Sequence, residues 1–294
     1  MTETHKLTFK GLERDVSLAP FTTFKVGGPA KYFFAAKTRD DIVHAVSEAT
    51  KAGVPFFILG GGSNVLVSDK GFDGLVIRLQ NTAVEIEGTH VTADAGGSLQ
   101  LCIQKTIKAG LMGLEYLTGI PGSVGGAVAG NAGTSQRWIA ERITQVHIVN
   151  GAGVVTVVPK NQCDFSYRYS RFKYSTTEIV LAAEFELEKG DRKTSAAEAK
   201  KIIDRRAHQP AGKACAGCAF KNPPEGSAGK IIDEAGLKGK RIGGAFISQE
   251  HGNFIVNDGT ATSEDIVILI SYVKQQIRDK YGIQLHEEIK YVGF

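Results

Sequence analysis

Hydrophobic and polar positions along the chain follow a helical period in some stretches and a strand period in others. Residues 263–281 carry the clearest helical pattern, with Thr262 or Ser263 as its N-cap and Gly282 as its stop. Residues 40–51 follow the same period, with Thr38 as a plausible N-cap and Gly53 at the end. Two further helices are predicted over residues 99–109, stopped by Gly110, and 195–208, closed by Pro210.

Short apolar runs bounded by turn residues predict the strands. They cover residues 55–59, 65–67, 75–79, 143–149, 154–158, 179–187 and 285–292. Asn150-Gly151 is a strong signal for a hairpin between two of them. Since helices and strands mix without a strict βαβ order, the pattern favours an α+β fold over a doubly wound sheet.

The polar, charged segment 189–194 is typical of a linker and predicts a domain boundary. We therefore expect one domain over residues 1–190, with an N-terminal subdomain of about residues 1–55, and a second over residues 191–294. A chain of 294 residues is long enough for two or three domains.

Composition narrows the class of protein. The net charge of +4 comes from dispersed basic residues, without the basic stripe and interleaved aromatics of a nucleic-acid binder. No apolar run approaches the roughly 18 residues that span a bilayer, and no targeting segment is visible. Four cysteines are too few for a disulfide scaffold. We expect a cytoplasmic protein that binds neither nucleic acid, nor membrane, nor metal.

Two glycine-dense loops, residues 60–64 and residues 119–133, are the strongest chemical signal. Consecutive glycines let backbone approach a ligand closely, and successive amides can hold a pyrophosphate. The triplet at Gly60 leads into a predicted strand, which excludes a P-loop and a Rossmann fingerprint. A tight turn and a helix of small residues are the alternatives. The residues predicted to contact a dinucleotide are Gly60, Gly61, Gly62, Ser63, Asn64, Gly119, Ile120, Pro121, Gly122, Ser123, Gly125, Gly126, Ala127 and Asn131.

Ordered sequence blocks across nearly the whole chain resemble the UDP-N-acetylenolpyruvoylglucosamine reductase family, in its shorter subtype. The blocks are the two glycine loops and residues 21–30, 167–172, 217–223, 228–233, 252–257 and 285–289. The resemblance implies a PCMH-type FAD-binding domain, similar to vanillyl-alcohol oxidase, and a smaller C-terminal substrate domain. It also implies NADPH-dependent formation of UDP-N-acetylmuramate for peptidoglycan, by a monomer. Neither glycine loop contains histidine, so we expect non-covalent FAD.

The same resemblance assigns the chemistry to particular residues. Arg168 matches the family's catalytic arginine and Glu288 its catalytic glutamate, although Glu287 is a close rival. Cys218 stands where many relatives have the serine that donates a proton. A thiol, with an ordinary pKa of about 8.5, is a more acidic donor than an alcohol. Lys221, Asn222 and Arg171 are the expected substrate-binding residues.

Several alternatives stay open. Cys215 and Cys218 form a C-x-x-C spacing that also suits half a zinc site or a redox pair. Ser227 is a fallback proton donor, and Trp138 is more typical of a core residue than of cofactor stacking. The rival functions are an FAD-dependent sugar or alcohol oxidase of the same superfamily and a non-catalytic flavin-binding module.

Overall fold

The computed structural model describes residues 7–206, 209–210 and 212–294. The chain divides into two compact units. The first unit contains residues 1–14, 32–61 and 74–206, and the second contains residues 15–31, 62–73 and 207–294. Two short N-terminal segments thus belong to the same unit as the C-terminal third of the chain. The predicted boundary between FAD-binding and substrate domains near residue 190 stays a prediction.

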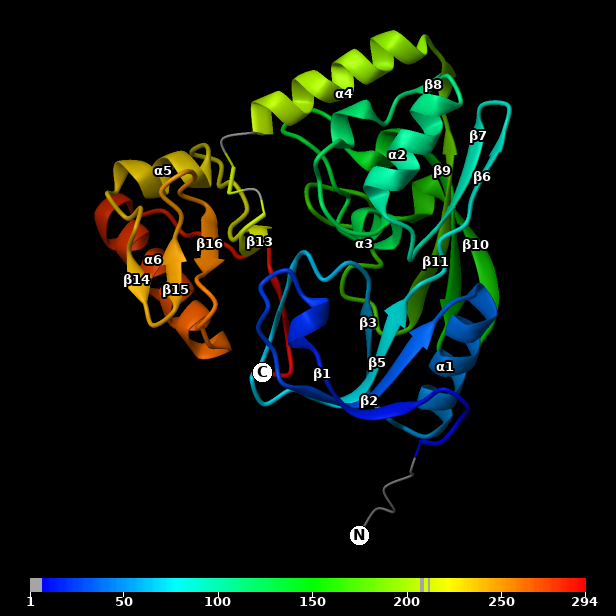
Figure 1. Ribbon diagram of the computed structural model, residues 1–294, viewed down its shortest axis with the longest axis horizontal. Helices are drawn as coiled ribbons and strands as arrows, with labels where there is room; N and C mark the ends of the chain where they lie inside the picture. The colour runs from blue at the N-terminus through cyan, green and yellow to red at the C-terminus, as the bar shows by residue number, and fades with distance from the viewer. Residues whose placement is uncertain (1–6, 207–208, 211) are drawn as a thin grey trace. The chain divides into compact units, whose positions relative to one another are not determined.

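The second unit is built on a four-stranded antiparallel sheet in the order β13 (Ala214–Cys218), β16 (Phe254–Asn257), β15 (Ala245–Ile247) and β14 (Arg241–Ile242). Two helices, α5 (Ala228–Glu234) and α6 (Ser263–Tyr281), accompany this sheet (Figure 1). The buried face of α6 packs with apolar side chains from both early segments, Phe24 and Leu66 among them. This shared core is the reason that those segments join the unit.

A parallel pair of strands closes the second unit. β4 (Val65–Val67) pairs with β17 (Lys290–Val292), with Val65 opposite Lys290. The predicted strand over residues 285–292 is therefore wrong in its first part. Its backbone changes partner before Lys290 and pairs with residues 219–221 instead, through an antiparallel bridge between Phe220 and Glu287.

Two further sheets, of five and four strands, lie mainly in the first unit. One is antiparallel, in the order β10 (Val155–Pro159), β9 (Ile143–Asn150), β11 (Glu178–Glu186), β7 (His90–Asp94) and β6 (Val84–Glu87). The other has the order β1 (Glu13–Ser17), β2 (Pro29–Ala36), β5 (Phe72–Leu79) and β3 (Phe56–Leu59). The helices of the first unit are α1 (Arg39–Lys51), α2 (Leu99–Lys108), α3 (Val124–Ala129) and α4 (Arg192–Arg206). In the same unit, β8 (Leu111–Met112) pairs with β12 (Glu188–Lys189).

Helix ends follow the sequence signals closely. Thr38 and Asp41 form a capping box at the start of α1, and Thr262 and Asp265 form another at the start of α6. Gly282 ends α6 in the left-handed conformation at φ 70°. The hairpin around Asn150 and the helix after residue 98 are confirmed as β9–β10 and α2.

The predicted linker over residues 189–194 is wrong. Lys189 pairs in β12, and α4 already begins at Arg192. The segment is polar because α4 buries little, with Ser195 as its one fully buried residue among those described. The last two residues of the predicted helix 195–208 lie outside the described part of the chain.

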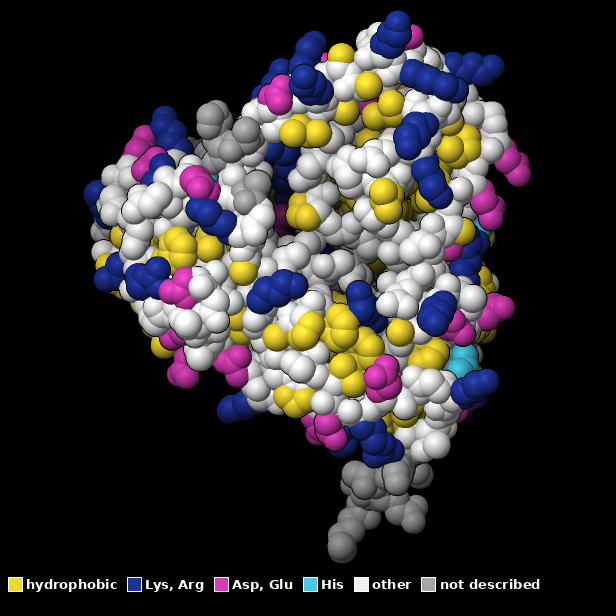
Figure 2. Space-filling model, viewed as in Figure 1, with side chains coloured by type: hydrophobic (Ala, Val, Ile, Leu, Met, Phe, Trp, Pro, Cys, Tyr) yellow, Lys and Arg dark blue, Asp and Glu magenta, His cyan; other side chains and the backbone are white. Residues whose placement is uncertain are grey.

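Charge is mixed on the face of the molecule seen in Figure 2. Lysine and arginine side chains are spread over that face and are interspersed with acidic ones. None of the helices that the structure describes has both the length and the apolar composition needed to cross a bilayer.

Candidate active site

The two glycine loops meet inside the first unit. A Cβ on Gly61 would lie 2.8 Å from the Cα of Gly122, and one on Gly60 would lie 2.3 Å from the Oγ of Ser123. Side chains at these two positions would force the loops apart, so glycine is required for the contact. Gly61 and Pro121 are exposed, so backbone of both loops is accessible where they meet.

The second loop is partly a small helix. The amides of Val124 and Gly125 donate to Gly97 and Ala95, each at 2.8 Å, and the Oγ of Ser123 caps α3 by accepting from Gly126 at 3.2 Å. A Cβ on Gly125 would lie 2.7 Å from that of Ala95. The helix of small residues, the alternative given for this run, is thus present over residues 124–129. Its amides are used inside the protein.

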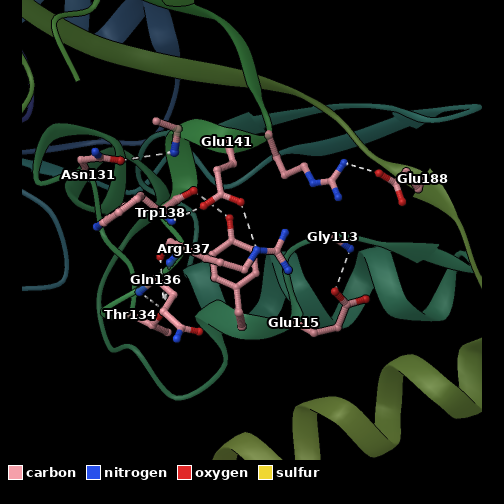
Figure 3. A network of polar contacts seen from close by, with 12 residues as sticks. Gly113, Glu115, Asn131, Thr134, Gln136, Arg137, Trp138, Glu141 and Glu188 are labelled. Atoms are coloured by element: carbon pink, nitrogen blue, oxygen red, sulfur yellow. Dashed lines mark hydrogen bonds and ion pairs between the residues drawn. The ribbon is translucent and has the colours of Figure 1, made fainter. Parts of the chain in front are cut away.

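Asn131 ends the second loop in a polar network (Figure 3). Its Oδ1 accepts from the amide of Ala140 at 3.3 Å, and its Nδ2 donates to the carbonyl of Ser166 at 2.9 Å. Glu141 accepts from the amide of Trp138 at 2.8 Å and from Nε of Arg137 at 3.0 Å. The network fixes the backbone that follows the loop. Trp138 belongs to this network and its indole nitrogen is buried.

Arg168 lies at the tip of a tight turn beside that loop. Ser166 and Tyr169 close the turn with two backbone hydrogen bonds of 3.0 and 3.1 Å. The hydroxyl of Ser170 donates to the carbonyl of Ala129 at 2.8 Å, which ties the turn to the end of α3. Arg168 has φ 55°, an uncommon conformation for a residue with a side chain. Such strain is typical of positions whose side chain must point in one direction.

The guanidinium of Arg168 is largely enclosed. Its Nε and Nη1 atoms are buried, and its Cζ lies 5.4 Å from the centre of the Tyr167 ring. Lys173, itself buried, donates from Nζ to the carbonyl of Arg168 at 2.8 Å. The ammonium of Lys173 therefore contacts the backbone of the residue that carries the guanidinium. Their charge suits an anionic ligand.

Arg171 makes its contacts within the protein. Its guanidinium forms a bidentate pair with the carboxylate of Glu178 and donates to the carbonyl of Gln162 at 2.8 Å. The hydrogen bond to Glu178 raises the pKa of Arg171 further above its usual range. Its predicted contact with the substrate stays a prediction.

Cys218 and Glu288 lie on two backbone segments that pair in the second unit. The amide of Glu288 donates to the carbonyl of Ala219 at 2.9 Å, and the amide of Lys221 donates to the carbonyl of His286 at 2.9 Å. Cys218 directly precedes this pair of hydrogen bonds, and both Cys218 and Glu288 are half-buried. Cys218 and Glu288, 70 positions apart by their residue numbers, thus lie on neighbouring backbone segments.

Glu287, the rival of Glu288, takes part in an ion pair. The carboxylate of Glu287 accepts from Nζ of Lys274 at 2.8 Å, in an ion pair with α6. Adjacent residues of an extended segment point to opposite sides, so Glu288 faces away from this pair. The preference for Glu288, based on its motif position, stays a prediction.

Two of the predicted substrate-binding residues, Lys221 and Asn222, lie at the end of the segment that pairs with residues 286–288. Lys221 is half-buried and Asn222 exposed. The Oδ1 of Asn222 accepts from the amide of Ala228 at 3.0 Å, at the start of α5. Ser227, the fallback donor, is the N-cap of α5, but its side chain makes no capping hydrogen bond.

Asn253 is a supporting residue that the sequence did not single out. Its side chain accepts from the amide of Phe220 at 2.9 Å and donates to the carbonyl of Phe220 at 2.8 Å, while its carbonyl accepts from Ala219 at 2.8 Å. It is 2% exposed. The side chain thus replaces a strand partner and clamps the backbone that follows Cys218. Only its place in the block 252–257 could have pointed to it.

The C-x-x-C spacing contains a β-bulge. Cys215 lies opposite Val256 and Cys218 opposite Phe254, so three steps on β13 match two on β16. Gly217, at φ 72°, takes up the extra residue. Burial raises the pKa of the Cys215 thiol. Within the described residues, no cluster of three or more histidine, cysteine or acidic side chains is arranged to hold a metal ion.

Comparison with known proteins identifies the class first. Residues 30–158 match the family model of an FAD-binding domain, and residues 209–292 match that of the UDP-N-acetylenolpyruvoylglucosamine reductase C-terminal domain. The chain is therefore a flavoprotein with a second, reductase-type domain. The bare backbone of the two meeting glycine loops fits an FAD dinucleotide, because closely spaced glycines leave room for a diphosphate.

The chain belongs to the UDP-N-acetylenolpyruvoylglucosamine reductase family. The protein of that name from Bacillus subtilis is 40% identical over 94% of this chain and 92% of its own. The one from Caldanaerobacter subterraneus is 38% identical over 92% and 90%. The crystal structure of the Thermus caldophilus reductase has a TM-score of 0.83 at 37% identity, and covers 96% of this chain and 98% of that one. The α+β fold with an FAD-binding domain is confirmed.

Proposed function

We propose that this protein reduces UDP-N-acetylglucosamine enolpyruvate to UDP-N-acetylmuramate, for peptidoglycan synthesis, with electrons from NADPH. The names of its relatives give the reaction, and the pairing of the Cys218 and Glu288 segments is the observation that supports it best. An oxidase or a flavin-binding module would need neither side chain. We further propose a monomer in the cytoplasm, with an FAD domain over residues 1–190 and a substrate domain over residues 191–294.

FAD is proposed to bind along the two glycine loops without a covalent bond. Gly60 and Gly61 meet Gly122 and Ser123, and backbone of residues 60–64 and 119–123 would face the diphosphate. Bound FAD supplies hydride transfer from NADPH to the substrate. The amides of α3 are already used, so residues 125–127 would contribute close packing rather than hydrogen bonds.

The protein's own side chains are proposed to stabilise the negative charge that develops on the substrate and to donate the proton. The substrate carries a carboxylate on a carbon–carbon double bond, and reduction leaves negative charge on the carbon beside that carboxylate. Arg168, with its buried guanidinium nitrogens, would stabilise this charge. Cys218 would donate its thiol proton to that carbon, and Glu288 would orient the carboxyl end of the substrate. Lys221, Asn222 and Arg171 are the proposed contacts to the rest of the substrate.

Two anaerobic half-reactions test the proposal. The purified protein should show the absorption spectrum of an oxidised flavin, which NADPH should bleach. Adding the enolpyruvyl nucleotide should then restore the oxidised spectrum in the absence of oxygen. An oxidase would regain its colour only with oxygen, and a binding module would not be bleached by NADPH. Either of those results would overturn the proposed reaction.

A further inference from the structure

Asn64 makes a contact that its place in the first glycine loop does not predict. Its Nδ2 donates to the main-chain carbonyl of Glu288 at 3.0 Å, across 224 positions of the sequence. Its own carbonyl accepts from the amide of Lys290 at 3.0 Å. Asn64, Glu288 and Lys290 all belong to the second unit. The side chain therefore reaches the backbone that carries the proposed catalytic carboxylate.

This contact extends the parallel pairing of β4 and β17 by one step. The ladder runs from Val65 opposite Lys290 to Val67 opposite Val292. Beyond its end, the side-chain amide of Asn64 takes the place of a backbone donor. On its other side, the segment around Glu287 pairs with residues 219–221.

Both backbone groups of Glu288 are thereby fixed in opposite directions. Its amide donates to Ala219, next to Cys218, and its carbonyl accepts from Asn64. These two hydrogen bonds restrain rotation of the peptide groups on either side of the Glu288 Cα. The direction of the Cα–Cβ bond, from which the carboxylate extends, follows from that restraint.

We propose that Asn64 is a positioning residue for Glu288, acting through the main chain, rather than a side-chain contact to the cofactor. The inference rests on the proposed function for the role of Glu288. It assigns the asparagine of the glycine loop to substrate reduction and leaves the loop's backbone for the flavin. An error of about 1 Å at a reacting group can slow a step by about 100-fold, so a single hydrogen bond at this point is enough to matter.

The test compares Asn64→Ala with a matched control, Asn150→Ala. Asn150 also holds backbone with its side chain, accepting from Ala152 and Val154 in the β9–β10 hairpin, and belongs to no proposed site. In Asn64→Ala, flavin content and bleaching by NADPH should match wild type. The limiting rate of reoxidation by the enolpyruvyl nucleotide should fall about 10- to 100-fold, with little change in the half-saturating concentration. Asn150→Ala should leave both half-reactions unchanged.

A double variant separates positioning from a general structural effect. In a Glu288→Gln background, Asn64→Ala should slow reoxidation by less than about twofold, because the group it positions is already disabled. A full, multiplicative loss in that background would overturn the proposal. So would a loss of flavin affinity with a normal rate of reoxidation per bound flavin.

Hydrogen exchange tests the contact without any substrate. The amides of Glu288 and Lys290 should exchange about 10-fold faster in Asn64→Ala than in Asn150→Ala, since local opening becomes easier. Unchanged exchange at both amides would contradict the inference. If instead wild type fails to reoxidise with the nucleotide while exchange changes as expected, the proposed function fails and the positioning contact stands.

Discussion

At the scale of single residues, Cys218 carries the most specific chemistry. Removing its thiol removes the proposed proton donor and leaves the sequence of the two proposed flavin-binding loops unchanged. Cys218→Ala should therefore slow reoxidation by the enolpyruvyl nucleotide about 100-fold or more, while bleaching by NADPH stays near wild type. Rapid-mixing absorbance of the two half-reactions measures both.

The serine variant is the matched control for that substitution. Cys218→Ser keeps a proton donor of similar size, and should retain clearly more activity than the alanine variant. Full activity in Cys218→Ala would remove the residue from the mechanism. A correctly folded Cys218→Ser variant with no activity would contradict the assignment of the proton donor to this position.

Asn253 makes a prediction about stability. Asn253→Ala leaves the amide and carbonyl of Phe220 buried without their side-chain partner. The expected loss in the free energy of unfolding is about 2–4 kcal/mol, and Asn150→Ala, at the half-buried end of β9, should cost less. Urea unfolding followed by circular dichroism measures the difference. Equal losses in the two variants would show that the clamp contributes nothing special.

At this scale, the sequence indicates candidate catalytic side chains but not the residues that hold the backbone around them. Cys218, Glu288 and Arg168 are candidates because the motifs around them resemble those of the family. Asn253 and Asn64 contact backbone that is 33 and 224 positions away. No local pattern encodes such a pairing, so their roles could be read only from the structure.

At the scale of elements, the conformation of the first glycine loop requires a glycine at position 62. Gly62 has φ 63°, and a Cβ there would lie 2.1 Å from the carbonyl oxygen of Phe21. Gly53, after α1, has a similar φ of 61° but open space around it. Gly53→Ala should cost about 1 kcal/mol for the backbone conformation alone. Gly62→Ala should cost clearly more, and should also weaken flavin binding, because backbone must move.

Thermal unfolding and flavin titration of these two variants measure that contrast. Equal stability of the two variants would mean that the backbone at Phe21 can move away from the added methyl group without loss of stability. Flavin affinity at wild-type level in Gly62→Ala would remove the first loop from the proposed FAD site.

Helices were predicted more accurately than strands, for a physical reason. The ends of α6 depend on a local capping box and a left-handed glycine, which the sequence displays directly. The segment 285–292 has the alternation of a strand, but alternation does not say which backbone it will pair with. Its switch of partner at residues 289–290 was therefore missed. The charged residues 192–194 resembled a linker because most of α4 is exposed.

At the scale of the whole molecule, the chain's organisation follows from long-range packing. Residues 15–31 and 62–73 share a unit with residues 207–294, and Phe24, Leu66 and α6 share its core. The two-domain α+β class could be predicted from the order of elements and from the resemblance. The return of early segments to the late unit could not, because it depends on contacts between distant stretches.

The four thiols give a test of burial across the molecule. Burial raises the pKa of Cys102 and Cys163 to about 11, so both stay protonated and shielded at pH 8. Cys215 and Cys218 are half-buried. A maleimide reagent should label these two in the native protein, and Cys102 and Cys163 only after unfolding. Peptide mass spectrometry with and without urea reads this directly, and early labelling of Cys102 would contradict the described core.

The central claim is that this protein saturates an enolpyruvyl double bond with electrons from NADPH. A single anaerobic turnover tests it: NADPH-reduced protein is mixed with UDP-N-acetylglucosamine enolpyruvate, and the nucleotide is recovered for mass spectrometry. The account predicts a nucleotide heavier by one pair of hydrogens, in an amount equal to the flavin reoxidised. Recovery of unchanged nucleotide beside a flavin that stays reduced would contradict it.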